Sequence, residues 1–283
     1  QAAASALILF STLINSWLFG EWDILSLSSS SSIPLTIAIC MKLGLAPLHF
    51  WMPEVLQGIP LPTGLILSTW QKIAPMSLLI QISQMTNVSL LIIIGVTSII
   101  IGGWGGINQT QLRKIMAFSS IGHLGWMVII LKFNPTLTLF NFLLYVMMTS
   151  AMFMTLISMN TTKISQLSTS WPKTPALTTI SMLTILSLGG LPPLTGFAPK
   201  LMISLELTKQ NTPLLAGLML LASLLALFFY IRLTYMMTLT MAPNSSASQT
   251  MWRSLLDNST ITATLSSLAL FLLPITSTII IML

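Results

Sequence analysis

The chain has 283 residues, of which 54% are hydrophobic and only 6% are charged, and its mean hydropathy is +0.90. A soluble domain carries roughly 25% charged residues, so this composition excludes a soluble globular protein and indicates a helical membrane protein. Basic residues outnumber acidic ones, 11 to 5. They are dispersed, with no basic run longer than Arg113-Lys114, which argues against nucleic-acid binding. The single Cys40 excludes an internal disulfide and a multi-cysteine metal or iron–sulfur site.

Repeated apolar runs of about 20 residues predict transmembrane helices. We expect an all-α membrane protein, a polytopic helical bundle with about nine transmembrane spans. The connectors are short and polar, so a single transmembrane domain is predicted over residues 1–283. The expected spans are 1–19, 33–52, 61–83, 88–106, 112–131, 136–159, 175–208, 213–239 and 260–282.

Charges on the connectors predict the orientation, because basic residues collect on the cytoplasmic or matrix side. That side is expected to hold Arg113, Lys114, Lys163, Lys173 and Arg253. The opposite side is expected to hold Lys132, Lys209, Glu21 and Asp23. For each of these charges, topology alone is the simpler interpretation. Trp51, Trp171 and Trp252 lie near span ends and suggest an interfacial aromatic belt.

A hidden internal repeat joins residues 44–54, GLAPLHFWMPE, to residues 190–200, GLPPLTGFAPK, which align without a gap. Proline removes a helix hydrogen bond, so each copy is expected to break its helix. Paired interruptions indicate inverted-repeat transport architecture. We expect an incomplete first repeat near 1–84, a second near 88–239 and a C-terminal span near 260–282. Two ordinary proline kinks are the simpler alternative.

Three lysines are predicted at membrane depth, where a charge costs about 2.5–3.5 kcal/mol and usually marks a functional site. Lys42 precedes the first break, Lys72 lies inside the span 61–83, and Lys200 follows the second break. Desolvation weakens the hold of a lysine on its proton, and nearby carboxylates or water restore it. The three lysines therefore predict a proton relay. Snorkelling to an interface is the structural alternative for Lys42 and Lys200.

Two histidines are further relay candidates, since imidazole titrates near neutral pH. His49 lies inside the first break, and His123 lies in FSSIGHLGW between glycines that let helices approach closely. A packing or hydrogen-bonding role is the alternative for each. Glu54, at the edge of the first break, is interpreted as an interfacial counter-ion. The run GGWGG at 102–106 lacks the context of a nucleotide loop and indicates close helix packing.

Three stretches carry a resemblance to a known family: residues 41–79, 102–126 and 188–200. Together they resemble NADH–ubiquinone oxidoreductase chain 2 of animal mitochondria, an antiporter-like family in the membrane arm of respiratory complex I. The resemblance covers essentially the whole chain. It implies that Lys42, Lys72 and Lys200 match lysines of a hydrophilic axis, and that the chain translocates protons in the mitochondrial inner membrane.

The resemblance also implies partners and cofactors. The partners would be other complex I membrane-arm subunits, lipids, protons and internal water. No cofactor is expected in this chain, because NADH, FMN, iron–sulfur clusters and ubiquinone would be held by partner subunits. The alternatives are a stand-alone cation/proton antiporter and a structural spacer of the membrane arm.

One departure from the family pattern concerns Lys42. Family members carry an acidic residue on an earlier helix that pairs with the matching lysine. No predicted span supplies this acid, since Glu21 and Asp23 lie in a connector. The family also starts with two helices that are not found before Gln1. The sequence is therefore expected to be N-terminally incomplete, with the partner of Lys42 missing from it.

Overall fold

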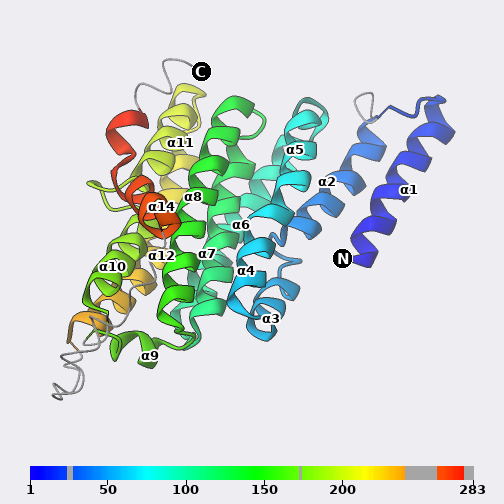
Figure 1. Ribbon diagram of the computed structural model, residues 1–283. Coiled ribbons are helices and arrows are strands. Elements are labelled where there is room, and N and C mark those ends of the chain that lie inside the picture. Colours follow the sequence, from blue (N-terminus) through cyan, green and yellow to red (C-terminus); the bar gives the residue numbers. More distant parts are fainter. Residues whose placement is uncertain (24–27, 172–173, 240–259, 277–283) are drawn as a thin grey trace, which may run out of the picture.

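The computed structural model describes residues 1–23, 28–171, 174–239 and 260–276. These ranges fold into helices, which confirms the predicted all-α class (Figure 1). Four helices are long and apolar enough to cross a membrane: α1 (Ala2–Phe19), α6 (Val88–Ile107), α8 (Pro135–Met159) and α12 (Pro213–Leu239). The chain is therefore a multi-pass membrane protein.

The other helices are shorter or carry more charge. They are α2 (Ser29–Leu43), α3 (Trp51–Gly58), α4 (Leu61–Ser68), α5 (Trp70–Gln81), the 3-10 turn η2 (Ser83–Met85), α7 (Leu112–Ile130), α9 (Ile164–Ser168), α10 (Pro175–Gly189), α11 (Phe197–Lys209) and α14 (Thr260–Phe271).

Three of the nine predicted spans are each divided between two helices. The breaks in 33–52 and 175–208 were expected, and they separate α2 from α3 and α10 from α11. The span 61–83 was expected to be continuous, and that prediction is wrong, because it is divided at Thr69 into α4 and α5. The length of the helices alone does not confirm nine crossings.

Several helices begin at a proline, whose fixed φ and missing N–H suit the first turn. Pro135, Pro175 and Pro213 open α8, α10 and α12. Asn134 adds a cap to α8, because its Oδ1 accepts a hydrogen bond from the Leu137 amide at 3.1 Å. These local signals account for where α8, α10 and α12 begin.

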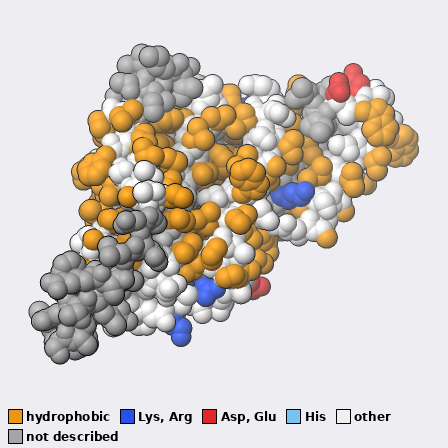
Figure 2. All heavy atoms as spheres, in the orientation of Figure 1, with side chains coloured by type: hydrophobic (Ala, Val, Ile, Leu, Met, Phe, Trp, Pro, Cys, Tyr) orange, Lys and Arg blue, Asp and Glu red, His pale blue; other side chains and the backbone are white. Residues whose placement is uncertain are grey.

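The helices lie side by side, with α1 and α2 at one edge of the molecule and α10, α12 and α14 at the other (Figure 1). Apolar side chains cover most of the middle of the face drawn in Figure 2, whereas acidic side chains lie toward its margins. Exposed apolar residues along α1, α6 and α12 include Trp17, Trp104 and Leu221, at 87%, 71% and 66% exposure. Such a surface suits lipid or a neighbouring subunit.

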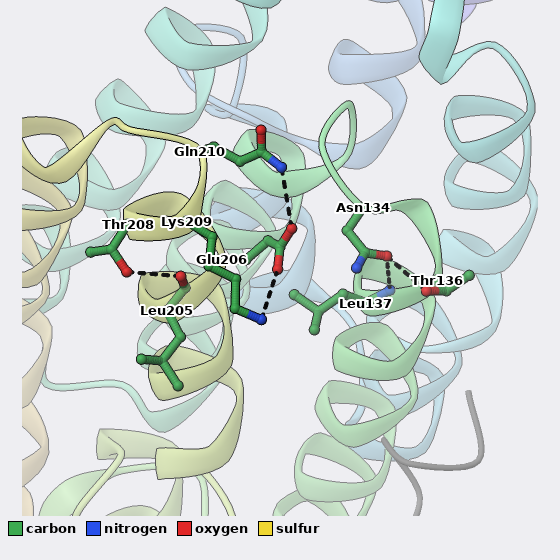
Figure 3. A network of polar contacts seen from close by, with 8 residues as sticks. All are labelled: Asn134, Thr136, Leu137, Leu205, Glu206, Thr208, Lys209 and Gln210. Carbon is green, nitrogen blue, oxygen red and sulfur yellow. Dashed lines mark hydrogen bonds and ion pairs between the residues drawn. The ribbon is translucent and has the colours of Figure 1, made fainter.

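Different sets of charged residues lie at the two ends of the bundle. At one end, a bridge between Gln111 and Lys163 joins the connections on either side of α7 and α8. At the other end, Lys132 Nζ donates to the Thr86 carbonyl at 2.8 Å. The Lys209–Glu206 ion pair, at 3.9 Å, lies at the end of α11, beside the start of α8 (Figure 3).

Among the described residues, Lys163 lies at one end and Lys132 and Lys209 lie at the other, as the predicted sorting of charges requires. Lys173, Arg253 and Trp252, which were part of that prediction, lie outside the described residues. Which end faces the matrix stays a prediction.

Glycines let α6, α7 and α12 approach one another closely, as the GGWGG run predicted. A Cβ on Gly102 would lie 2.8 Å from the Gly122 amide nitrogen and 2.9 Å from the Phe118 carbonyl oxygen of α7. A Cβ on Gly103 would lie 2.7 Å from Leu225 Cβ on α12. Small residues at helix interfaces are the usual means of close packing in membranes.

Replacing Gly102 by alanine should separate α6 from α7, because the atoms in the way belong to backbone and cannot rotate aside. Overpacking of this kind costs about 1–3 kcal/mol. We expect a lower thermal-unfolding midpoint for Gly102→Ala in detergent. Gly217→Ala on α12, where an added Cβ meets nothing within 4 Å, is the control. Equal midpoints for the two variants would contradict this account of the packing.

Candidate functional site

The helices that precede the two breaks end in the same way. Gly44 and Gly190 end α2 and α10 in the left-handed conformation, with φ/ψ of 78°/35° and 79°/44°. The amide of each glycine donates to the carbonyl three residues earlier, at 3.1 and 2.9 Å. The next amide, of Leu45 or Leu191, donates to the carbonyl five residues earlier, at 3.0 and 3.5 Å. This is the Schellman arrangement, which satisfies the last carbonyls of a helix.

The second half of each broken helix also starts in the same way. Helices α3 and α11 begin at the aligned residues Trp51 and Phe197. Just inside each start, an amide bonds the carbonyl three residues back: Met52 to His49 at 3.0 Å and Ala198 to Thr195 at 3.1 Å. The two breaks thus share these backbone bonds at aligned residues.

Lys42 and Lys72 face one cavity of about 270 Å³, although they belong to different interrupted helices. Lys42 lies in the last turn of α2, and Lys72 lies in the first turn of α5 and is only 2% exposed. Gln71 and Trp51 also line this cavity. The cavity is large enough for several waters.

The break at Thr69 places Lys72 at the start of a helix. Ser68 Oγ and Thr69 Oγ1 both donate to the Leu65 carbonyl, at 3.0 and 2.7 Å. Such back-bonding bends helices. The Lys72 amide then bonds the Thr69 carbonyl at 3.2 Å, as in a tight turn. Pro75, one turn further on inside α5, removes another backbone donor.

Tyr145 on α8, which the sequence analysis did not single out, holds the Lys72 ammonium. Lys72 Nζ donates to the Tyr145 hydroxyl at 2.9 Å and lies 5.1 Å from the centre of its ring. The hydroxyl in turn donates to the Ser68 carbonyl at 3.1 Å. Tyr145 is fully buried. A lone tyrosine in an apolar helix carries no sequence signal of its own, and only the contact with Lys72 reveals it.

Lys200 reaches back from α11 to the end of α10. Its Nζ donates to the Gly189 carbonyl at 2.7 Å, so a cation lies at a helix C-terminus, where the helix dipole favours positive charge. Gly190 provides the space, since a Cβ there would lie 3.0 Å from Lys200 Cδ, Cε and Nζ. Among the described residues, no carboxylate lies within 4 Å of the ammonium groups of Lys42, Lys72 or Lys200.

His123 on α7 shares a second cavity with Lys200, of about 20 Å³. Ser119 and Tyr230 line the same cavity. This volume is enough for one water molecule. The His123 ring lies 5.9 Å from the Tyr145 ring, centre to centre. The predicted candidates therefore fall into two groups, Lys42 with Lys72 and His123 with Lys200, and Tyr145 lies between them.

His49 lies apart from both groups. Its ring packs 4.4 Å from Phe50 and 6.3 Å from Phe118, centre to centre, and its Nδ1 lies 3.3 Å from the Pro47 carbonyl oxygen. His49 lines a third cavity, which also contains Glu54 and Lys114. The structure does not place His49 beside Lys42, Lys72 or Lys200, and its relay role stays a prediction.

Two residues that sequence reasoning assigned to topology or to the membrane interface hold the two ends of α3 in place. Trp51 Nε1 donates to the Met41 carbonyl at 3.0 Å, which ties α3 to the end of α2. Arg113 Nη1 donates to the Gln57 carbonyl at 3.1 Å and also to the Ile59 carbonyl. Arg113 therefore caps the C-terminal end of α3 from α7.

Comparison with known proteins identifies the family. A profile described as "NADH:quinone oxidoreductase/Mrp antiporter, TM" matches residues 1–226, and one described as "NADH dehydrogenase subunit 2 C-terminus" matches residues 227–280. NADH-ubiquinone oxidoreductase chain 2 of Aquarana catesbeiana is 64% identical over 282 residues, which are 100% of this chain and 82% of that protein. The chain belongs to the NADH-ubiquinone oxidoreductase chain 2 family.

Solved structures share the fold of this chain 2 family member. A chain of respiratory complex I from Thermus thermophilus with bound aureothin is 25% identical, with a TM-score of 0.79 over 96% of this chain and 66% of that one. A chain of the Mrp complex from Dietzia sp. DQ12-45-1b is 17% identical, with a TM-score of 0.78 over 87% of this chain and 51% of that one. The second likeness shows the fold alone.

Arg113→Met should destabilise the protein, because it removes a charged cap from two carbonyls at the end of α3. One of these hydrogen bonds is exposed and the other part-buried, and a typical hydrogen bond contributes about 0.5–1.5 kcal/mol. We expect a lower thermal-unfolding midpoint and faster proteolysis near residues 57–60. Lys209→Met, at a side chain that is 74% exposed, is the control. A midpoint for Arg113→Met as high as that of the control would show that the cap contributes little.

Proposed function

We propose that this chain is a membrane-arm subunit of respiratory complex I in the mitochondrial inner membrane, and that it moves protons through a lysine and water relay. Electron transfer from NADH to ubiquinone would take place in partner subunits, which would also hold FMN and the iron–sulfur clusters. The names of its chain 2 relatives and the likeness to a chain of complex I support the assignment to that assembly.

The observation that carries the relay is the meeting of Lys42 and Lys72 at one cavity, from two helices that are each interrupted. A signal from a neighbouring subunit would change the proton affinity of Lys42. The proton would leave the Lys42 ammonium, cross through water in the cavity and protonate the Lys72 amine. His123 and Lys200, at their water-sized cavity, would form the next pair along the same path.

The paired breaks support an inverted-repeat arrangement, with a first repeat near 1–84 and a second near 88–239 within one transmembrane domain. The matched hydrogen bonds at Gly44 and Gly190 favour it, because paired interruptions mark the ion path in such transporters. We also propose nine crossings, three of them made by interrupted helices, with the end that carries Arg113 and Lys163 facing the matrix.

A stand-alone cation/proton antiporter is the second candidate, because a chain of the Mrp complex shares the fold. The two candidates predict different assemblies. Native-gel separation of gently solubilised membranes, with peptides of this chain tracked across the bands, distinguishes them. Comigration with NADH-oxidising activity in a very large assembly supports the complex I subunit. A small separate band without that activity supports the antiporter and contradicts the proposal.

Lys72→Met should abolish most proton pumping without preventing assembly, since methionine keeps the apolar length of lysine but carries no proton. We expect at least a tenfold loss of pumping by the assembled complex, measured as the pH gradient formed per NADH oxidised. Unchanged pumping would contradict the relay. Failure of Lys72→Met to assemble would favour a spacer role instead.

Gly190→Ala should impair coupled turnover several-fold more than Gly20→Ala. Both glycines have positive φ, 79° and 73°, so both variants carry the cost of a left-handed alanine, about 1–2 kcal/mol. Only the alanine at position 190 would press on Lys200, because an added Cβ at Gly20 meets nothing within 4 Å. Equal NADH-driven pumping by the two variants would show that the placement of Lys200 is unimportant.

A further inference from the structure

Tyr145 lies between the two cavities of the proposed relay and contacts groups from both. On one side its hydroxyl accepts a hydrogen bond from Lys72 at 2.9 Å, and Lys72 faces the cavity of Lys42. On the other side its ring lies 5.9 Å from that of His123, which faces the cavity of Lys200. Tyr145 is fully buried, so its hydroxyl is not in contact with bulk water.

The single proton of the Tyr145 hydroxyl is not donated to His123 in this structure. It donates that proton to the Ser68 carbonyl at 3.1 Å. A tyrosine hydroxyl both donates and accepts, so it can hand a proton onward while it receives another. A backbone carbonyl accepts a hydrogen bond but does not pass a proton on. With Ser68 as its acceptor, Tyr145 is therefore closed toward the second cavity.

The Ser68 carbonyl is available to Tyr145 because the helix is broken beside it. In a regular helix this carbonyl would accept the amide four residues later, which is the amide of Lys72. That amide bonds Thr69 instead, at 3.2 Å. At the break, the Ser68 carbonyl is bonded by the Tyr145 hydroxyl, whereas the amide of Lys72 bonds the next carbonyl.

We propose that Tyr145 is a proton gate between the Lys42–Lys72 cavity and the His123–Lys200 cavity, and that the direction of its hydroxyl sets the state of the gate. The gate is closed while the hydroxyl donates to the Ser68 carbonyl, and it opens when the hydroxyl turns toward His123. This inference rests on the proposed proton-moving function, which it deepens by naming the residue that joins the two pairs.

The transfer balances without any further reactant. In the open state one N–H bond of the Lys72 ammonium breaks and an O–H bond forms on Tyr145. The original hydroxyl proton leaves Tyr145 for the water in the second cavity or for His123. Lys72 ends as the neutral amine, Tyr145 ends unchanged, and the acceptor gains one proton. No tyrosinate persists, because donation and acceptance occur together.

Tyr145→Phe in the assembled complex tests the gate, since it removes only the hydroxyl. We expect pumping per NADH oxidised to fall at least tenfold. Tyr235→Phe, at a ring that is 60% exposed on α12, should pump like the unmodified complex. Tyr145→His restores a ring with an exchangeable proton and should recover a measurable part of the pumping. Recovery by histidine separates proton transfer from a merely structural role, which an imidazole does not mimic.

The outcomes separate the gate from the function on which it rests. Normal pumping by Tyr145→Phe with loss in Lys72→Met overturns the gate and leaves the relay standing. Normal pumping by both variants overturns the proposed function itself. If Tyr145→Phe does not assemble, Tyr145→His decides: an assembled complex with partial pumping supports the gate, and one that oxidises NADH without any pumping overturns it.

Discussion

Lipid offers no hydrogen bonds, so each polar group inside this bundle has to find its partner within the protein or in a wet cavity. The interrupted helices meet this constraint with a small set of contacts. Left-handed glycines close the ends of α2 and α10, Trp51 bonds a carbonyl across the first break, and Arg113 caps the far end of α3. At the second break the cation of Lys200 bonds the last carbonyl of α10. Specific hydrogen bonds therefore stabilise the backbone at the breaks, and Lys200 makes one of these bonds.

The same constraint explains why the site consists of pairs. An ammonium at this depth requires water or polar protein atoms around it. Few polar protein atoms lie beside these lysines in the described residues. Lys42 and Lys72 share one cavity, and Lys200 shares another with His123. Tyr145 separates the pairs and bonds to one of them. A path made of separate wet compartments can be interrupted at one contact, which a continuous water column cannot.

The two halves of the repeat use their breaks differently. In the first, the lysine lies before the glycine, on the helix that ends there, whereas in the second it lies beyond the break and reaches back across it. Glu54 occupies the repeat position that matches Lys200, and it lines a different cavity, together with His49. The two breaks thus share backbone hydrogen bonds but carry different side chains at aligned positions.

Part of this arrangement could be predicted from the sequence. Proline and glycine have strong local effects on backbone, so the breaks at 44–54 and 190–200 and the closeness of α6 to α7 were foreseeable. The break at Thr69 was missed, because Ser68 and Thr69 are ordinary residues whose bonds to the Leu65 carbonyl depend on context. Tyr145 was missed because its role lies in a contact between residues 73 positions apart, and one sequence carries no trace of such a pairing.

The most direct test of the account is to locate ordered water in the assembled complex, in an experimental map sharp enough to show it. The account predicts water in the cavity between Lys42 and Lys72, a single water between His123 and Lys200, and Tyr145 as the link between the two. A continuous file of water that joins the cavities without passing the Tyr145 hydroxyl would contradict it.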